Sequence, residues 1–191
     1  MFFAHPSFCF ADQYRIVSKY SIEGVSIGDS LLKFFSLDEI KKNIRWNYYS
    51  YIKDKRFISA IFTSPSFKKY NQIQVHFKRN DKDYIVHAIG GVIYYEDKIS
   101  KCYKRQDKDV ESLRLELKDM DIEEAITGFI PHPSDNSGES INRAYGFLFK
   151  SFDLILRVDC TDWSPKMKPY QDNYRINLTT VEVDLWFSDF Y

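Results

Sequence analysis

Two cysteines are the clearest candidates for chemistry in this sequence. Cys102 and Cys160 lie far apart, and no Cys-x-x-Cys pair typical of a zinc site or a thioredoxin-type centre is present. The third cysteine, Cys9, belongs to an apolar N-terminal stretch. If export removes that stretch, an even pair remains, which predicts a structural disulfide between Cys102 and Cys160. The alternative is two buried free thiols in a cytosolic protein.

The carboxylates around Cys160 are a second candidate. Asp159 and Asp162 flank this cysteine in the segment VDCTDW, and two acids near an aromatic ring can in principle supply general acid and base catalysis. The simpler interpretation is that Asp162 starts a turn and that Asp159 faces solvent or pairs with a basic side chain. We therefore assign no catalytic residue.

The histidines do not suggest a metal site. His5, His76, His87 and His132 do not recur at the helical spacing of four. His76 and His87 could meet across a hairpin, but strand histidines are more often hydrogen-bonded than metal-bound. The chain also lacks a nucleophile elbow, a Walker A loop, a dinucleotide fingerprint, an HExxH helix and an EF-hand loop. The sequence thus predicts neither a metal nor a cofactor.

The segment WNYYSY is the best remaining lead to a binding site. It holds Trp46, Tyr48, Tyr49 and Tyr51, which are too many neighbours for one pleated face to bury, so some should reach the surface. Exposed Tyr and Trp side chains are efficient anchors for protein or carbohydrate partners. We treat these four as candidate partner-binding residues. The alternative is core packing with scattered surface aromatics.

The composition favours a single folded domain around these residues. The 191-residue chain is 44% hydrophobic, with 16 Phe and 14 Tyr, which is enough apolar surface to offset the entropy of ordering the chain. Its 27 basic side chains equal its 27 acidic ones, so no net field attracts nucleic acid. Apolar runs fall short of the roughly 20 residues that a membrane span needs. We expect neither nucleic-acid binding nor a transmembrane segment.

The N-terminus indicates export. Residues 1–11, MFFAHPSFCFA, resemble the end of a secretory signal, an apolar region followed by a small residue at the cleavage point. Polar sequence begins abruptly at Asp12. We expect residues 1–11 to be removed, residues 12–191 to form the domain, and the protein to be periplasmic or secreted. The alternative is an ordinary N-terminal strand or tail.

The elements that carry the two cysteines orient both toward the core. A helix is expected from Asp97 to Asp119, with Asp97 as its cap and Cys102 on its apolar face, where Gln106 is the interruption. A strand is expected from Leu154 to Thr161, with Cys160 on its apolar face and Arg157 and Asp159 on the other. A helix packed on a sheet would need both orientations for a bridge.

The first half of the chain predicts short helices and then strands. Residues 14–27 indicate a strand or extended lead-in, and residues 29–44 two short helices joined at Ser36, which has capping-box spacing to Glu39. A strand should end before Pro65. Residues 72–78 and 84–95 alternate between apolar and polar positions and should form a hairpin around the turn 80–83. Gly90 and Gly91 inside its second strand predict a bulge or bend.

The second half predicts a loop and further strands. Residues 120–140 read as a surface loop because they end in PHPSDNSGES. Strands are expected at 143–150 and 173–178, besides the one that carries Cys160, with a turn at 151–153. Residues 180–190 should form a helix with Val181, Leu185 and Trp186 on one face; a continuing strand is the alternative.

Two stretches, DYIVHAIGGVIYYEDKISKCYKRQDKDV and VDCTDWSPKMKPYQDN, resemble small uncharacterised exported proteins of marine alphaproteobacteria. The shared features are a strand ending in apolar and aromatic residues, a helix carrying Cys-Tyr-Lys and a later Cys-x-Asp-Trp-Ser. The matching residues are Cys102, Tyr103, Lys104, Cys160, Asp162, Trp163 and Ser164. The resemblance implies export and paired cysteines, and it implies no activity.

These observations predict one α+β domain with an antiparallel sheet, one main amphipathic helix packed on it and short helices near both ends. For function, we expect a non-enzymatic exported domain that binds a protein or carbohydrate partner. The alternative is an enzyme of unfamiliar, hydrolase-like type whose carboxylates assemble only in the fold.

Overall fold

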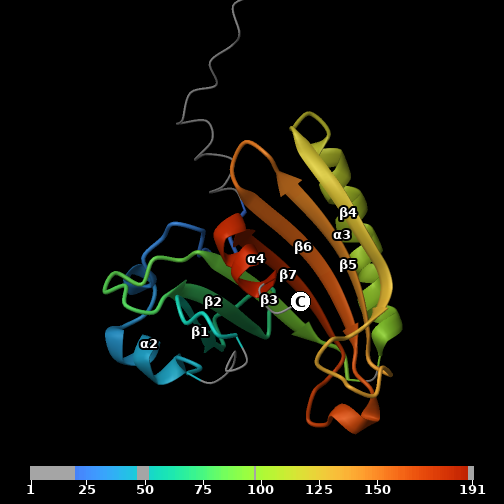
Figure 1. The fold of residues 1–191 in the computed structure, drawn as a ribbon, viewed down its shortest axis with the longest axis horizontal. Coiled ribbons are helices and arrows are strands. Elements are labelled where there is room, and N and C mark those ends of the chain that lie inside the picture. The colour runs from blue at the N-terminus through green and yellow to red at the C-terminus, as the bar shows by residue number, and fades with distance from the viewer. Residues whose placement is uncertain (1–19, 47–51, 97, 189–191) are drawn as a thin grey trace, which may run out of the picture.

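A seven-stranded antiparallel sheet with helices on both faces forms the fold (Figure 1). The computed structural model describes residues 20–46, 52–96 and 98–188. In chain order the strands are β1 (Phe57–Phe62), β2 (Gln72–Lys78), β3 (Ala88–Tyr94), β4 (Ile122–Pro131), β5 (Ile141–Phe149), β6 (Leu154–Asp162) and β7 (Asn173–Thr180). The expected α+β class with an antiparallel sheet is confirmed.

The strand order joins two meanders through the last strand. Across the sheet the order is β1-β2-β3-β7-β6-β5-β4, so β1 to β3 form one half and β4 to β7 the other. The helix α3 (Ile99–Leu117) connects the halves, and β7 pairs antiparallel with both β3 and β6. The sheet is therefore continuous only because β7 lies in its middle.

Helix α3 packs against one face of the second half, which we call the covered face. Its buried residues are Cys102, Gln106, Val110, Leu113 and Leu117. The polar side chain of Gln106 can be buried there because its amide nitrogen donates to the carbonyls of Val158 and Arg143, each at 2.7 Å. Asp97, the expected cap, lies outside the described residues.

The two cysteines meet between α3 and β6. Cys102 and Cys160 are both fully buried, and they form a disulfide with a Cα–Cα distance of 6.0 Å. This distance lies in the usual range for a bridge. Leu156 and Val158 lie on the same face of β6 as Cys160 and are buried with it, as the period of two predicts.

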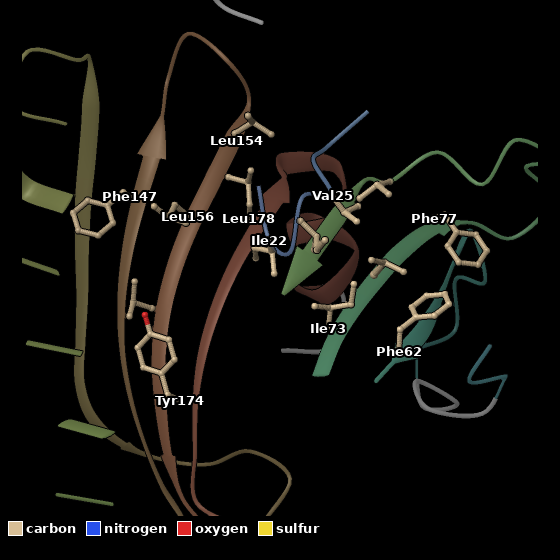
Figure 2. Packing of buried hydrophobic residues seen from close by; sticks show 14 of the residues in the cluster. Ile22, Val25, Phe62, Ile73, Phe77, Phe147, Leu154, Leu156, Tyr174 and Leu178 are labelled. Carbon is tan, nitrogen blue, oxygen red and sulfur yellow. The ribbon is translucent and has the colours of Figure 1, made fainter. Parts of the chain in front are cut away.

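Residues 20–44 cover the same face of the first half. The 3-10 helix η1 (Leu31–Lys33) and helix α2 (Leu37–Asn43) are joined at Ser36, whose side chain and that of Glu39 form the expected capping box. Of the strand or extended lead-in expected over 14–27, the strand is wrong for the described part, because Ile22 and Val25 make only an isolated bridge across a tight turn. Figure 2 shows the shared core, which runs from Phe147 past Leu156 to Ile73 and Phe62.

The hairpin of β2 and β3 is confirmed, but its second strand begins later than expected. Residues 84–86 pair with residues 28–31 instead: Ser30 bridges Ile85, and the Gly28 amide donates to the Val86 carbonyl at 2.8 Å. Of the bulge or bend expected at Gly90 and Gly91, the bulge is wrong, because the register runs unbroken through both.

Strand β4 corrects the expectation of a loop over 120–140. It pairs with β5 along its length, with a register shift at Gly128, whose φ of +64° suits glycine. Only residues 132–140 form a turn. There the Asp135 carboxylate accepts hydrogen bonds from the amides and hydroxyls of Ser137 and Ser140. These bonds hold the pKa of Asp135 well below its usual range, and the bond from the Ser140 hydroxyl contributes most.

Helix α4 (Val181–Ser188) confirms the C-terminal helix and packs on the opposite side of the sheet from α3 (Figure 1). Val183 and Trp186 are buried with Phe57 and Ala88 in a second, smaller core. Leu185 was expected on the same face as Trp186, but it is 59% exposed. Among the described residues, helices long and apolar enough to span a bilayer are absent.

Candidate binding face

The sheet face opposite α3 is apolar under α4 and polar over the second half. Strand alternation and register place every second side chain of β5, β6 and β7 on this open side of the sheet. We call six of its polar residues the polar face: Asn142, Arg157, Asp159, Thr161, Arg175 and Asn177.

Asp159 lies at the floor of the polar face. The residue is only 8% exposed, and one carboxylate oxygen, Oδ2, accepts a hydrogen bond from the Asn177 amide at 3.1 Å. The other oxygen, Oδ1, is buried and has no hydrogen-bond partner within the described residues. Burial raises the pKa of Asp159, against the lowering effects of Arg157, Arg175 and Asn177. A buried carboxylate that is only half satisfied costs stability.

Two arginines flank this carboxylate. Arg175 lies directly across from Asp159 in the register, and the Arg157 guanidinium lies 3.7 Å from Oδ1, which is an ion-pair contact and too long for a hydrogen bond. The Arg157 side chain is 42% exposed, so it can turn toward a ligand. The positive charge of Arg175 helps to lower the pKa of both His76 and His132, after burial as the main cause. The charge of Arg175 therefore acts on both histidines as well as on Asp159.

Small residues keep space open beside these charges. Gly146 pairs with Arg157 and Ala144 with Asp159 on β5, while Gly90 of β3 pairs with Asn177. A Cβ at Gly146 would meet its nearest neighbours at 3.8 and 4.0 Å, which is ordinary contact. At Gly90, in contrast, the Asn177 side chain already occupies the space that a Cβ would need.

An aromatic cluster follows the polar face at the end of β6. The Trp163 ring lies between His132, with ring centroids 4.2 Å apart, and Tyr170, which stacks at 4.8 Å. His132 accepts a hydrogen bond from the Ser134 amide through Nδ1. Burial, then the charge of Arg175, lowers the pKa of His132 to about 4, so the ring is neutral at pH 7. Tyr170 is 53% exposed and offers an accessible ring near this end.

The other end of the open side is closed by α4. His76 of β2 contacts the rings of Trp186 and Phe187 at centroid distances of 6.4 and 5.3 Å. Burial, then Arg175, lowers the pKa of His76 to about 3. The open stretch of the face therefore lies over β5, β6 and β7, between α4 and the aromatic cluster.

The structure separates most of the residues proposed from the sequence. Asp159 and Asp162 lie on opposite faces of β6, since they are three positions apart in a strand, so they do not form a pair. His76 and His87 are neighbours, with a backbone hydrogen bond of 2.8 Å, but within the described residues no His, Cys, Asp and Glu cluster could hold a metal. Trp46 is 58% exposed, as proposed for some of the aromatics, whereas Tyr48, Tyr49 and Tyr51 lie outside the described residues.

Sequence reasoning placed Arg157 and Asp159 on one side of their strand but missed their partners. Arg175 and Asn177 are distant in sequence, and only the β6–β7 register brings them to Asp159. The available signal was a polar residue at every second position in two predicted strands. Such alternation is usually read as a solvent-facing side, which hides a half-buried site.

Comparison of the chain with protein-family models, curated proteins and solved structures gave no match.

Proposed function

We propose that this protein is a non-enzymatic, exported binding domain whose polar face takes a small polar ligand. The observation that carries the proposal is the buried Oδ1 of Asp159, which has no hydrogen-bond partner although two arginines lie beside it. Buried polar atoms in folded proteins are nearly always satisfied, by protein, water or a ligand. A ligand hydroxyl or N–H group would supply the missing hydrogen bond.

The surrounding groups define the chemistry of that ligand. Asp159 accepts hydrogen bonds, whereas the guanidinium groups of Arg157 and Arg175 only donate them. A complementary ligand therefore has hydrogen-bond donors and acceptors close together, as in carbohydrates, hydroxy acids and amino acids. Tyr170 adds a ring that a sugar or other flat group can contact beyond the polar face. Of the two expected partners, protein and carbohydrate, such a face therefore favours a carbohydrate.

The alternative, a hydrolase-like enzyme with assembled carboxylates, finds less support. Asp159 is the only carboxylate among the six residues of the polar face; Glu123 shares this side of the sheet but lies on the edge strand β4, two strands away, and Asp162 points to the other side. Acid-base hydrolysis of the kind expected would need two acids across one substrate. Binding needs only the one acceptor and the two donors.

Export is part of the same proposal. The disulfide between Cys102 and Cys160 supports it, since structural disulfides persist in oxidising compartments. The resemblance to exported paired-cysteine proteins points in the same direction. Residues 1–11, the proposed signal remnant, lie outside the described residues.

The binding proposal is tested by thermal-shift screening of the oxidised protein. The probes are three sets at 10 mM: amino acids, hydroxy acids, and mono- and disaccharides. We expect at least one compound to raise the Tm of the wild type, because a ligand that binds only the folded state stabilises it. Asp159→Asn should abolish that shift, because the amide replaces an acceptor with a donor.

Asp162→Asn is the matched control, since it makes the same change on the same strand but on the opposite face. It should retain the wild-type shift. Equal responses of the two variants would contradict the proposal, as would a screen without a hit. Mass spectrometry of each hit after overnight incubation separates binding from catalysis: an altered compound would favour the enzyme.

A further inference from the structure

A polar pocket lies away from the polar face, beside the outer edge of β1. It is a shallow pocket with room for about one oxygen-sized group in its enclosed part. Its lining comes from the residues after α2, from the start of β1, from the end of β2 and from α4: Arg45, Trp46, Lys55, Phe57, Ile58, Ser59, Arg79 and Trp186. None of these residues is acidic.

Ser59 gives the pocket an unsatisfied polar floor. The residue is fully buried at 0% exposure, and its Oγ has no hydrogen-bond partner within the described residues. The Arg45 amide donates to the Ser59 carbonyl at 2.8 Å, next to the bridge between Ile44 and Ala60. This backbone contact holds Arg45 alongside Ser59 at the sheet edge. A buried hydroxyl without a partner would gain a hydrogen bond from a group bound in the pocket.

Two guanidinium groups provide positive charge at the same place. Neither Arg45 nor Arg79 forms an ion pair with the described acids, and the Arg45 side chain makes no hydrogen bond there either. Arg79 is oriented by two contacts: its Nε donates to the Lys55 carbonyl at 3.1 Å, and its guanidinium lies over the Trp46 ring at 5.6 Å. Its terminal nitrogens are left for a ligand. Nearby Glu182 is engaged by Arg56 and Lys78.

We propose that this pocket binds the oxyanion of a phosphate monoester. One phosphate oxygen would accept the Ser59 hydroxyl hydrogen, and Arg45 and Arg79 would donate to the others. Paired guanidinium groups suit phosphate because their planar donors match its oxygens. The exposed Trp46 ring then lies where the organic part of the ester emerges. This assigns a role to Trp46, the described member of the aromatic segment, and it does not depend on the polar face.

Isothermal titration calorimetry with phenyl phosphate tests the assignment. We expect saturable one-to-one binding by the wild type in 20 mM salt. Arg45→Met should weaken it at least tenfold, and Ser59→Ala severalfold. Both variants should fold, since the replaced side chains make no hydrogen bond among the described residues. Lys42→Met is the matched control, because it removes one exposed positive charge from α2 away from the pocket, and it should bind within twofold of the wild type.

Two further titrations separate the sources of the phosphate group. Saturable binding of phenyl phosphate assigns a free ester. Cosedimentation with phosphatidylcholine vesicles that contain phosphatidic acid, lost in Arg45→Met, assigns a lipid headgroup. Failure of both probes would overturn the proposal. So would equal losses in Arg45→Met and Lys42→Met, because the effect would then be that of net charge alone. Asp159→Asn should leave these titrations unchanged, which keeps this test separate from that of the polar face.

Discussion

The side-chain oxygen of Asn177 occupies the space above Gly90 in which any other residue would place its Cβ. The two residues face each other across β3 and β7, and the same Asn177 side chain donates to Asp159. A glycine in the middle of a strand ordinarily weakens it. Here it gives Asn177 room to reach the buried carboxylate.

Gly90→Ala should therefore destabilise the protein and disturb the polar face. The new methyl group would displace Asn177, so we expect a loss of roughly 1 to 3 kcal/mol in the free energy of unfolding, as for other overpacked sites. Urea denaturation measures the loss. Gly146→Ala is the matched control, because its Cβ meets only ordinary contacts on the same face. Comparable losses in both variants would contradict this explanation of Gly90.

Loss of the disulfide should have the largest effect on stability. Cys102 and Cys160 are separated by 58 residues, so the chain-entropy estimate for the bridge is about 4 kcal/mol. Replacing both by Ala should lower the free energy of unfolding by up to that amount in urea. Dithiothreitol should lower the stability of the wild type in the same way and leave the double variant unaffected. A wild type insensitive to the reductant would show that the bridge adds no stability.

Asp159→Asn should stabilise the protein at neutral pH. Burial raises the pKa of Asp159 above the ordinary 3.8, so at pH 7 the fold carries an ionised group that the unfolded chain solvates better. Removing the charge should raise the free energy of unfolding by about 1 kcal/mol, in the range of typical stabilising changes. The gain should vanish below pH 3.8, where the carboxyl is protonated in both states.

Urea denaturation at pH 7 and pH 3.5 checks both parts of the expectation for Asp159. Asp162→Asn should gain less, because that carboxyl is less buried and lies outside the polar face. A variant of Asp159 that is less stable than the wild type at pH 7 would show that the carboxylate is a structural group. The polar face would then lose its main support.

His132→Asn should flatten the acid dependence of stability. The pKa of His132 is about 4 in the fold, because of burial and Arg175, and 6.5 in the unfolded chain. Between these values the unfolded chain binds a proton that the folded chain does not, so stability falls as the pH drops from 6.5 to 4. Asn keeps an acceptor for the Ser134 amide but cannot take up the proton.

The difference between wild type and His132→Asn should reach about 1 kcal/mol across this window, after allowance for solvent screening of a partly exposed ring. Thermal denaturation at half-unit pH steps from 7 to 4 measures it. His76 remains in both proteins, so a residual slope is expected. An unchanged slope in the variant would contradict the assignment of neutral His132.

The elements with strong periodicity were predictable from the sequence, because each has one buried side. Helix α3 and strands β2, β5 and β6 fall close to their expected ranges. The joint at Ser36 was also correct, since a capping box is a local signal that needs no tertiary context. Both cysteines point inward for the same reason.

The failures arose where tertiary pairing decides the structure. Strand β4 was missed because its segment ends in the turn sequence PHPSDNSGES, and because Glu123, Glu124 and Gly128 are typical of an edge strand and not of a buried one. Residues 84–86 have the composition of a strand, yet their backbone pairs with residues 28–31. Of the polar face, only the shared side of Arg157 and Asp159 was predictable, since Asp159 and Asn177 meet only through strand register.

The strand that completes the sheet is also the last to be made. Since β7 lies between β3 and β6, a nascent chain that has emerged only as far as β6 holds two half-sheets, in which β3 and β6 each have an unpaired edge. Cys160 precedes β7, so the thiols can react while the halves are still apart. An oxidant met at that stage would tie α3 to β6 before the halves close. A chain truncated before residue 173 would thus have two additional exposed edges, at β3 and β6, and a tendency to associate with its copies.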